Sequence, residues 1–228
     1  MPNDIIYILK EQIDTEELKY SLRSVERNFP HNRVWFVGGQ PSGLVPDVRL
    51  PHKQTGNCKW ELIRSSMNKA INAEALTDDF FLFNDDFFVM KKFKGRFTNF
   101  VDGTLSRRID ELHRDKGMNA YCRTLFKLEQ ELLTMKEPTM NYDVHLPMLL
   151  NKEQVKATLY SCSSPQMRSA IGNINRLPYQ IHEDVKVYDL ESVPEYETFL
   201  STNDQTFQNG KVGEYIRDTF TIKSRFEV

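Results

Sequence analysis

The chain has 228 residues, a mass of 26.8 kDa and a formal net charge of −2 at neutral pH. This length predicts one domain, or one domain with a small appendage. The near balance of 30 basic and 32 acidic residues excludes a surface that is basic throughout, but it does not exclude a local basic groove. Hydrophobic residues make up 39% of the chain and aromatic residues 11%, which is enough for a core and excludes wholesale disorder.

The chain shows no signal for export or membrane insertion. No apolar run approaches the ~20 residues that a membrane-spanning helix needs, and the first residues lack the basic and apolar regions of a secretory signal. The cysteines Cys58, Cys122 and Cys162 are widely spaced and form no CxxC pair, so neither a disulfide framework nor a zinc ribbon is predicted. We therefore expect a soluble protein of the reducing cytoplasm.

The first ninety residues alternate between short apolar runs, typical of buried strands, and amphipathic repeats, typical of helices. The expected strands are residues 5–9, 34–37, 47–50 and 79–83, and the expected helices run from Asp14 or Thr15 to about Asn28 and over about 59–75. Strands that alternate with helices need crossover connections, which predict a largely parallel sheet. Ligands of such sheets usually bind beyond the carboxyl ends of the strands.

The pattern changes after residue 90. Residues 104–135 are expected to be helical, with a break near Gly117, and the SSP triplet at 163–165 predicts the start of another helix. Residues 185–188 alternate and predict a short strand. The simplest interpretation is one globular body over residues 1–228, in which the second half contains a helical insertion.

The sharpest local feature is the pair Asp85 and Asp86 between two aromatic runs, in the sequence FNDDFF. Neighbouring carboxylates in an apolar setting are costly unless a cation or hydrogen-bond donors compensate them. Mg²⁺ and Mn²⁺ meet that need through oxygen ligands, often shared with phosphate. A solvated acidic turn between two hairpin strands is the alternative interpretation.

His145 lies in the sequence YDVHLP and is a candidate general base or metal ligand. In a strand, Asp143 faces the same side as His145, and a contact between them is then possible. A structural role for His145 is the alternative.

Three further features have both a functional and a structural interpretation. Arg23, with Arg27 one turn later, is placed to bind phosphate from one helix face or to lie in solvent. Asn57 and Lys59 stand at a loop-to-helix junction, which suits either an anion or a simple helix cap. The basic segment KKFKGR (91–96), with interleaved phenylalanines, suits single-stranded nucleic acid or a solvated loop.

Several well-known motifs are missing from the chain. The sequence contains no GxxxxGK[ST], GxGxxG, GxSxG or HExxH motif. This disfavours the familiar ATPase, dehydrogenase, hydrolase and zincin classes.

Three blocks of the chain resemble the Stealth family, the sugar-phosphate transferases of bacterial capsule synthesis, which are related to the animal lysosomal-enzyme phosphotransferase. ELKYSLRSVE (17–26) resembles the family's ELRYSLRS block, FLFNDDFF (81–88) resembles its FLYFNDDFF block, and HLP (145–147) is similar to its His-x-Pro block. YDVHLP and the ending SRFE (224–227) also resemble small phage-encoded glycosyltransferase-like proteins. The chain reads YILK (7–10) where the Stealth family has a strand with an acidic end, and this favours plain sugar transfer.

The resemblance implies a Rossmann-like α/β fold of the GT-A type. Residues 1–90 are then the donor-binding half, and residues 91–228 are the helical insertion and acceptor-side half. Asp85 and Asp86 are then ligands of Mn²⁺ or Mg²⁺, and Asp86 and His145 are the catalytic residues. The implied donor-binding residues are Arg23, Asn57, Lys59 and Asn84.

The function predicted from the sequence is a metal-dependent glycosyltransferase with a nucleotide-sugar donor, uridine being the base expected by analogy with the fold. The acceptor, a glycan or a modified DNA base, is left open. The alternatives are a Stealth-type sugar-1-phosphate transferase, a nucleic-acid-binding or DNA-modification protein, and a protein that kept the fold and lost catalysis.

Overall fold

The computed structural model describes residues 2–10, 16–53, 59–195 and 197–228, and its centre is a five-stranded sheet of order β3-β2-β1-β4-β7. These strands are β1 (Asp4–Leu9), β2 (Val34–Gly38), β3 (Val48–Pro51), β4 (Asp79–Phe83) and β7 (Met148–Asn151). All neighbouring pairs are parallel except β4 and β7, which are antiparallel. The predicted α/β fold with a mostly parallel sheet is confirmed.

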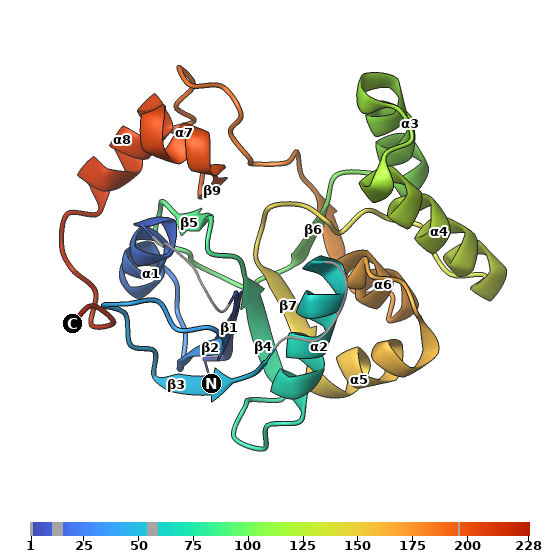
Figure 1. Cartoon of the computed structure of the whole chain (residues 1–228), viewed down its shortest axis with the longest axis horizontal. Coiled ribbons are helices and arrows are strands. Elements are labelled where there is room, and N and C mark those ends of the chain that lie inside the picture. The colour runs from blue at the N-terminus through green and yellow to red at the C-terminus, as the bar shows by residue number, and fades with distance from the viewer. Residues whose placement is uncertain (1, 11–15, 54–58, 196) are drawn as a thin grey trace.

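Helices cover both faces of this sheet (Figure 1). They are α1 (Glu16–Asn28) on one face, and α2 (Lys59–Ile71), α5 (Lys152–Ser161) and α6 (Met167–Ile174) on the other. Side chains alternate along β1, so Ile5 and Tyr7 join the core under α1 while Ile6 joins the core under α2. The expected helix start at Asp14 or Thr15 lies outside the described residues.

The predicted helical region after residue 104 forms a hairpin of α3 (Leu105–Lys116) and α4 (Ala120–Met135). The break falls at Gly117 as predicted, because this residue has φ 66°, a left-handed conformation that glycine adopts without strain. Figure 1 shows the hairpin at one end of the molecule and α7 (Asp204–Asn209) with α8 (Lys211–Thr219) at the other.

Two predictions about the second half are corrected. Residues 185–188 form no strand: Val185 and Val187 alternate inward as expected, but the segment meets its neighbour at a single bridge, between Lys186 and Ser201. The helix predicted at 163–165 begins only at Met167. The remaining strands form two small sheets, in which β5 (Phe87–Val89) pairs with β9 (Phe199–Ser201), and β6 (Asn99–Val101) pairs with β8 (Tyr179–Ile181).

In the part of the chain that the structure describes, no helix combines the length and apolar character that a membrane crossing requires.

A buried ion pair ties the C-terminal segment to α1. The Nε and Nη2 atoms of Arg23 donate to the two carboxylate oxygens of Glu227 at 2.7 and 2.6 Å, and Nη1 donates to the carbonyl of Phe220 at 2.8 Å. Both side chains are more than nine-tenths buried. Since the guanidinium has little water to replace these bonds, the pair should matter for stability.

We expect Glu227→Gln to lower the free energy of unfolding by about 3 kcal/mol, because it leaves the buried Arg23 charge without its partner. Urea unfolding followed by circular dichroism measures this. Glu191→Gln, which breaks the exposed pair with Lys211, is the control and should change stability by less than about 1 kcal/mol. Equal effects of the two substitutions would contradict the structural role of Arg23.

Candidate functional site

The acidic turn follows β4 at the carboxyl edge of the parallel strands. It is not the turn of a hairpin, because the next strand, β5, pairs with β9 and not with β4. β7 runs antiparallel to β4 with Met148 opposite Leu82, so the residues that precede β7 lie beside the residues that follow β4. This register brings His145 towards Asp85 and Asp86.

The two carboxylate oxygens of Asp86 differ in their hydrogen bonding. Its Oδ2 accepts hydrogen bonds from Lys186 Nζ at 2.8 Å and from the Ser201 hydroxyl at 3.2 Å. Its Oδ1 is buried and has no hydrogen-bond partner among the described residues. A buried carboxylate oxygen without a donor is costly, so this atom is a candidate contact for a cation or a ligand.

Asp85 and Glu17 add negative charge at the same place. Burial and then the charge of Asp86 raise the pKa of Asp85. The pKa of Glu17 is raised to about 7, mainly by burial and also by the charges of Asp86 and Asp85, against the hydrogen bond from the Thr202 hydroxyl at 2.7 Å. Ionisation of each of these carboxyl groups therefore costs free energy, and a bound cation would offset that cost.

His145 forms its side-chain contact with Asp184. The Nδ1 atom of His145 lies 2.7 Å from Asp184 Oδ2, and its backbone N–H donates to Asp184 Oδ1 at 3.1 Å. Burial alone would raise the pKa of Asp184, but these bonds hold it below its ordinary value. A carboxylate on Nδ1 fixes the tautomer that leaves Nε2 as a proton acceptor.

The contact between Asp143 and His145 that a strand would allow is not formed as a hydrogen bond or ion pair, although the charge of His145 acts on Asp143. Residues 143–147 form no strand, so the two side chains need not share a face. Instead, Asp143 accepts from the Ser169 hydroxyl at 3.0 Å, and burial raises its pKa.

Arg168 is the second cation beside the acids. It donates through Nη1 to the carbonyl of Val144 at 2.9 Å and through Nη2 to that of Leu146, and so holds the segment that carries His145. Burial lowers its pKa to about 10, against the charges of Asp143, Asp86 and Asp184. Its Nε is buried without a hydrogen-bond partner among the described residues.

Carboxylates outnumber cations in this acidic cluster. The carboxylates are Glu17, Asp85, Asp86, Asp143 and Asp184, and the cations are Lys186, Arg168 and, acting on Asp85, Lys10. Within the described residues, no group of three or more His, Cys, Asp or Glu side chains has the arrangement of a complete metal site. Any cation here would therefore need further ligands from water or from a substrate, as Mg²⁺ commonly does.

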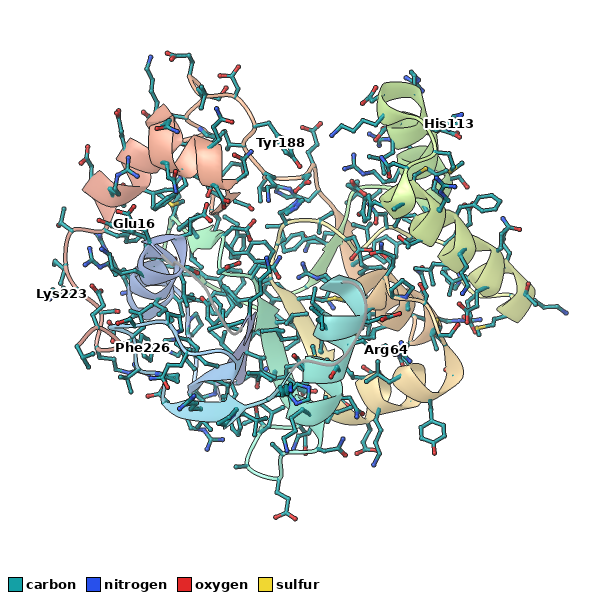
Figure 2. The ribbon with its side chains drawn as sticks, viewed as in Figure 1. Glu16, Arg64, His113, Tyr188, Lys223 and Phe226 are labelled. Atoms are coloured by element: carbon teal, nitrogen blue, oxygen red, sulfur yellow. The ribbon has the colours of Figure 1, made fainter. Side chains whose placement is uncertain are left out.

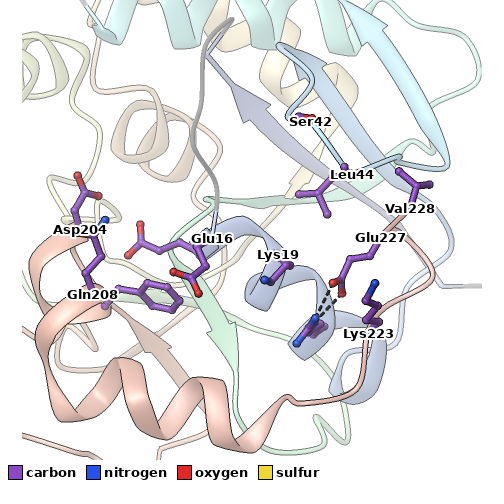
Figure 3. A pocket seen from close by; sticks show the side chains of 13 residues that line it. Glu16, Lys19, Ser42, Leu44, Asp204, Gln208, Lys223, Glu227 and Val228 are labelled. Carbon is purple, nitrogen blue, oxygen red and sulfur yellow. Dashed lines mark hydrogen bonds and ion pairs between the residues drawn. The ribbon is translucent and has the colours of Figure 1, made fainter.

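A cavity of about 680 Å³ lies next to Glu17 (Figure 3). Figure 3 shows Glu16, Asp204 and Gln208 on one side of it and Lys19, Lys223 and Glu227 on the other, with Ser42 and Leu44 above. Its size is within the range of small-molecule sites. Of the acidic cluster only Glu17 lines this cavity, and Asp85, Asp86 and His145 are not among its lining residues.

The predicted donor-binding residues lie in different surroundings. Arg23 lines the cavity, but Glu227 and the carbonyl of Phe220 already take the N–H groups described above. Asn84 is exposed in the acidic turn. Asn57 lies outside the described residues, as does the side chain of Lys59, the first residue of α2. Their roles in binding a donor stay predictions.

Sequence reasoning missed Asp184, Lys186, Arg168 and Glu17 as members of the site. Lys186 is 100 residues from its partner Asp86, and His145 is 39 residues from Asp184, so no local spacing pointed to these pairs. Figure 2 shows the labelled Tyr188, on the same segment as Asp184, between the α7–α8 pair and the α3–α4 hairpin. The alternation at 185–188 was the one available signal that this segment crosses the core.

No protein-family model matches the chain, and no curated protein matches it in sequence. Two solved structures have a backbone similar to that of this chain. The glycosyltransferase GlyE of Streptococcus pneumoniae TIGR4 has a TM-score of 0.46 and 8% identity over 97% of this chain, which spans 61% of the GlyE chain. A 4-diphosphocytidyl-2C-methyl-D-erythritol synthase has a TM-score of 0.40 and 13% identity over 81% of this chain and 90% of its own.

The raised pKa of Glu17 predicts a pH dependence of stability. Between the ordinary value of 4.5 and the raised value of about 7, the folded protein binds more protons than the unfolded chain. The free energy of unfolding therefore falls as the pH rises through this window. We expect Glu17→Gln to be more stable than wild type by about 1 to 3 kcal/mol at pH 8, relative to their difference at pH 5.

Urea unfolding at the two pH values, in EDTA, measures this difference. Glu16→Gln, on the exposed face of the same helical turn, is the control. If wild type and Glu17→Gln lose stability in parallel between pH 5 and pH 8, the Glu17 carboxyl is not the titrating group.

Proposed function

We propose that the chain is a metal-assisted glycosyltransferase that moves a sugar from a nucleotide-sugar to an acceptor hydroxyl. The observation that carries this proposal is that the acidic pair Asp85–Asp86 and the His145–Asp184 pair share one short segment of chain near the carboxyl edge of the sheet, because Lys186 contacts Asp86 and Asp184 contacts His145. The first pair provides negative charge for a cation, and the second provides a base. Nucleotide-sugar transfer needs both, since a diphosphate leaves and an alcohol loses its proton.

Asp85 and Asp86 are the residues that would hold Mn²⁺ or Mg²⁺. The unpartnered Oδ1 of Asp86 and the excess of carboxylates fit a divalent cation. Two carboxylates are few for a metal held by protein alone, but they suffice where phosphate oxygens and water complete the shell. When bound there, such a cation would stabilise the negative charge that develops on the diphosphate.

His145 is the proposed base. The acceptor oxygen forms a bond to the anomeric carbon of the sugar, the bond from that carbon to the diphosphate oxygen breaks, and the hydroxyl proton passes to His145 Nε2. Asp184 orients the ring and stabilises the imidazolium through Nδ1. Arg168 keeps this segment in place through the carbonyls of Val144 and Leu146.

Lys186 is assigned a positioning role. Burial alone would lower its pKa, but the charge and hydrogen bond of Asp86 outweigh this and raise it, so Lys186 stays protonated. It holds Oδ2 of Asp86 and leaves Oδ1 for another contact. Under this proposal, Lys186 fixes the Oδ2 atom of Asp86, and the Oδ1 atom contacts the ligand.

We expect Asp86→Asn to lower metal-dependent turnover by at least about 100-fold, because it removes a charge next to the leaving group. The assay incubates a panel of nucleotide-sugars with Mn²⁺ or Mg²⁺, with and without candidate acceptors, and identifies the released nucleotide by chromatography. Asp78→Asn, an exposed residue just before β4, is the matched control and should keep wild-type turnover.

The released nucleotide separates the two kinds of transfer. A nucleoside diphosphate means that the bond at the anomeric carbon breaks, as proposed. A nucleoside monophosphate means that the diphosphate breaks, and the Stealth-type transfer of a sugar phosphate replaces the proposal. Metal-dependent turnover that persists in Asp86→Asn would refute the role of the acidic pair.

We expect Asp184→Asn to lower kcat by about 100- to 10,000-fold with a small change in KM, because the amide no longer fixes the His145 tautomer or stabilises its charge. Steady-state kinetics measure this. Glu183→Gln, the exposed neighbouring residue, is the control. A kcat within threefold of wild type, on the order of half a kcal/mol, would exclude the orienting role of Asp184.

A further inference from the structure

A second cavity, of about 360 Å³, lies apart from the first and has a different character. Its walls include three phenylalanine rings, those of Phe93, Phe100 and Phe199. Lys92 and Lys94 lie at the same cavity, together with His182 and Glu197. We refer to it as the aromatic cavity.

The rings belong to one aromatic network. The centroids of Phe93 and Phe199 are 6.0 Å apart, those of Phe100 and Phe199 are 6.3 Å apart, and the ring of His182 meets Phe100 edge-on at 5.5 Å. Phe93 and Phe100 are only partly buried, whereas Phe199 is buried. Part of the aromatic surface of Phe93 and Phe100 is therefore not covered by the core and is available to a ligand.

The cavity opens next to the basic segment KKFKGR. Lys92, Lys94 and Arg96 are exposed, and none of the three has an ion pair with a carboxylate of the described chain. Lys92 and Lys94 line the cavity, whereas Arg96 lies farther along the chain and outside its lining. Several positive charges beside an aromatic wall fit a ligand with several phosphates and flat rings.

We propose that the aromatic cavity and the segment 91–96 bind single-stranded nucleic acid. One base lies against Phe93 and Phe100, and neighbouring phosphates contact Lys92, Lys94 and Arg96. Stacking on aromatic rings and phosphate contacts from a basic segment are the two interactions by which proteins hold single strands. A duplex would keep its bases stacked within the helix and out of the cavity.

Two polar side chains suit the edge of a base. The Glu197 carboxylate accepts from exocyclic amino or ring N–H groups, while His182 presents Nε2, 3.9 Å from Glu197 Oε2. The Nδ1 of His182 lies 2.6 Å from the carbonyl of Glu183. This leaves the Nε2 side of the ring for the cavity.

The aromatic cavity and the acidic cluster share one short segment of chain. Val185 lines the cavity, and its neighbours Asp184 and Lys186 contact His145 and Asp86. The binding proposed here does not rest on the transfer proposed above, because it needs neither a donor nor a metal. Asp86→Asn, which tests the transfer, should therefore bind nucleic acid like wild type.

Fluorescence anisotropy with a labelled 12-nucleotide single strand, its duplex and a labelled mononucleotide tests the proposal. We expect the single strand to bind at least about tenfold more tightly than the other two. Its affinity should fall with salt with a slope of about −2 on logarithmic axes, as expected for three phosphate contacts.

Two variants separate the charge from the rings. Lys92→Gln with Lys94→Gln removes two of the three phosphate contacts, and should reduce the salt slope by about 1.4 and weaken binding to every sequence alike. Phe100→Leu keeps an apolar side chain but removes the ring, and should weaken single-strand binding about tenfold. Lys156→Gln, an exposed lysine on α5, is the control, and thermal unfolding checks that each variant is folded.

Either of two results overturns the proposal. Binding of the single strand that is absent, or insensitive to both variants while they stay folded, excludes this cavity as the site. Equal affinity for the mononucleotide and the single strand replaces the proposal with a site for free nucleotides.

Discussion

The antiparallel pairing of β7 with β4 is the constraint on which the acidic cluster depends. In a purely parallel sheet, the chain would enter β7 from the opposite edge, and His145 would lie far from the acidic turn. Because β7 runs the other way, the residues before it arrive where β4 ends. The acidic turn after β4 and the segment that carries His145 before β7 therefore both lie at the carboxyl edge of the sheet. Both strands are packed in the core.

Charge balance explains how the cluster is arranged. Burying several carboxylates together costs free energy, and the fold offsets part of that cost with Lys186 and Arg168. Each cation has a second effect: Lys186 fixes one oxygen of Asp86, and Arg168 fixes the backbone that carries His145. The proposed divalent cation would offset the remaining negative charge, and the phosphates of a substrate would then bind to that cation.

The C-terminal half carries more of the site than its helical pattern suggested. The chain returns from α6 through β8 and then runs beside the end of β9, where Asp184 contacts His145 and Lys186 contacts Asp86. The last residues also return to α1, where Glu227 pairs with Arg23. Arg23, whose helical position suggested phosphate binding, is thus paired with a carboxylate of this chain, and its role in binding a donor stays a prediction.

The α/β fold, the order of strands and helices in the first ninety residues, the break at Gly117 and the acidic turn after β4 are all predictable from the amino-acid sequence. These features depend on local periodicity and on which residues tolerate each backbone conformation, and such information lies within a few residues of each position. Which side chains meet the acids depends instead on the packing of the folded chain. Asp184, Lys186 and Arg168 reach His145 and Asp86 from distant positions along the chain, and their distance from the acids in space depends on the packing of the whole sheet and its helices.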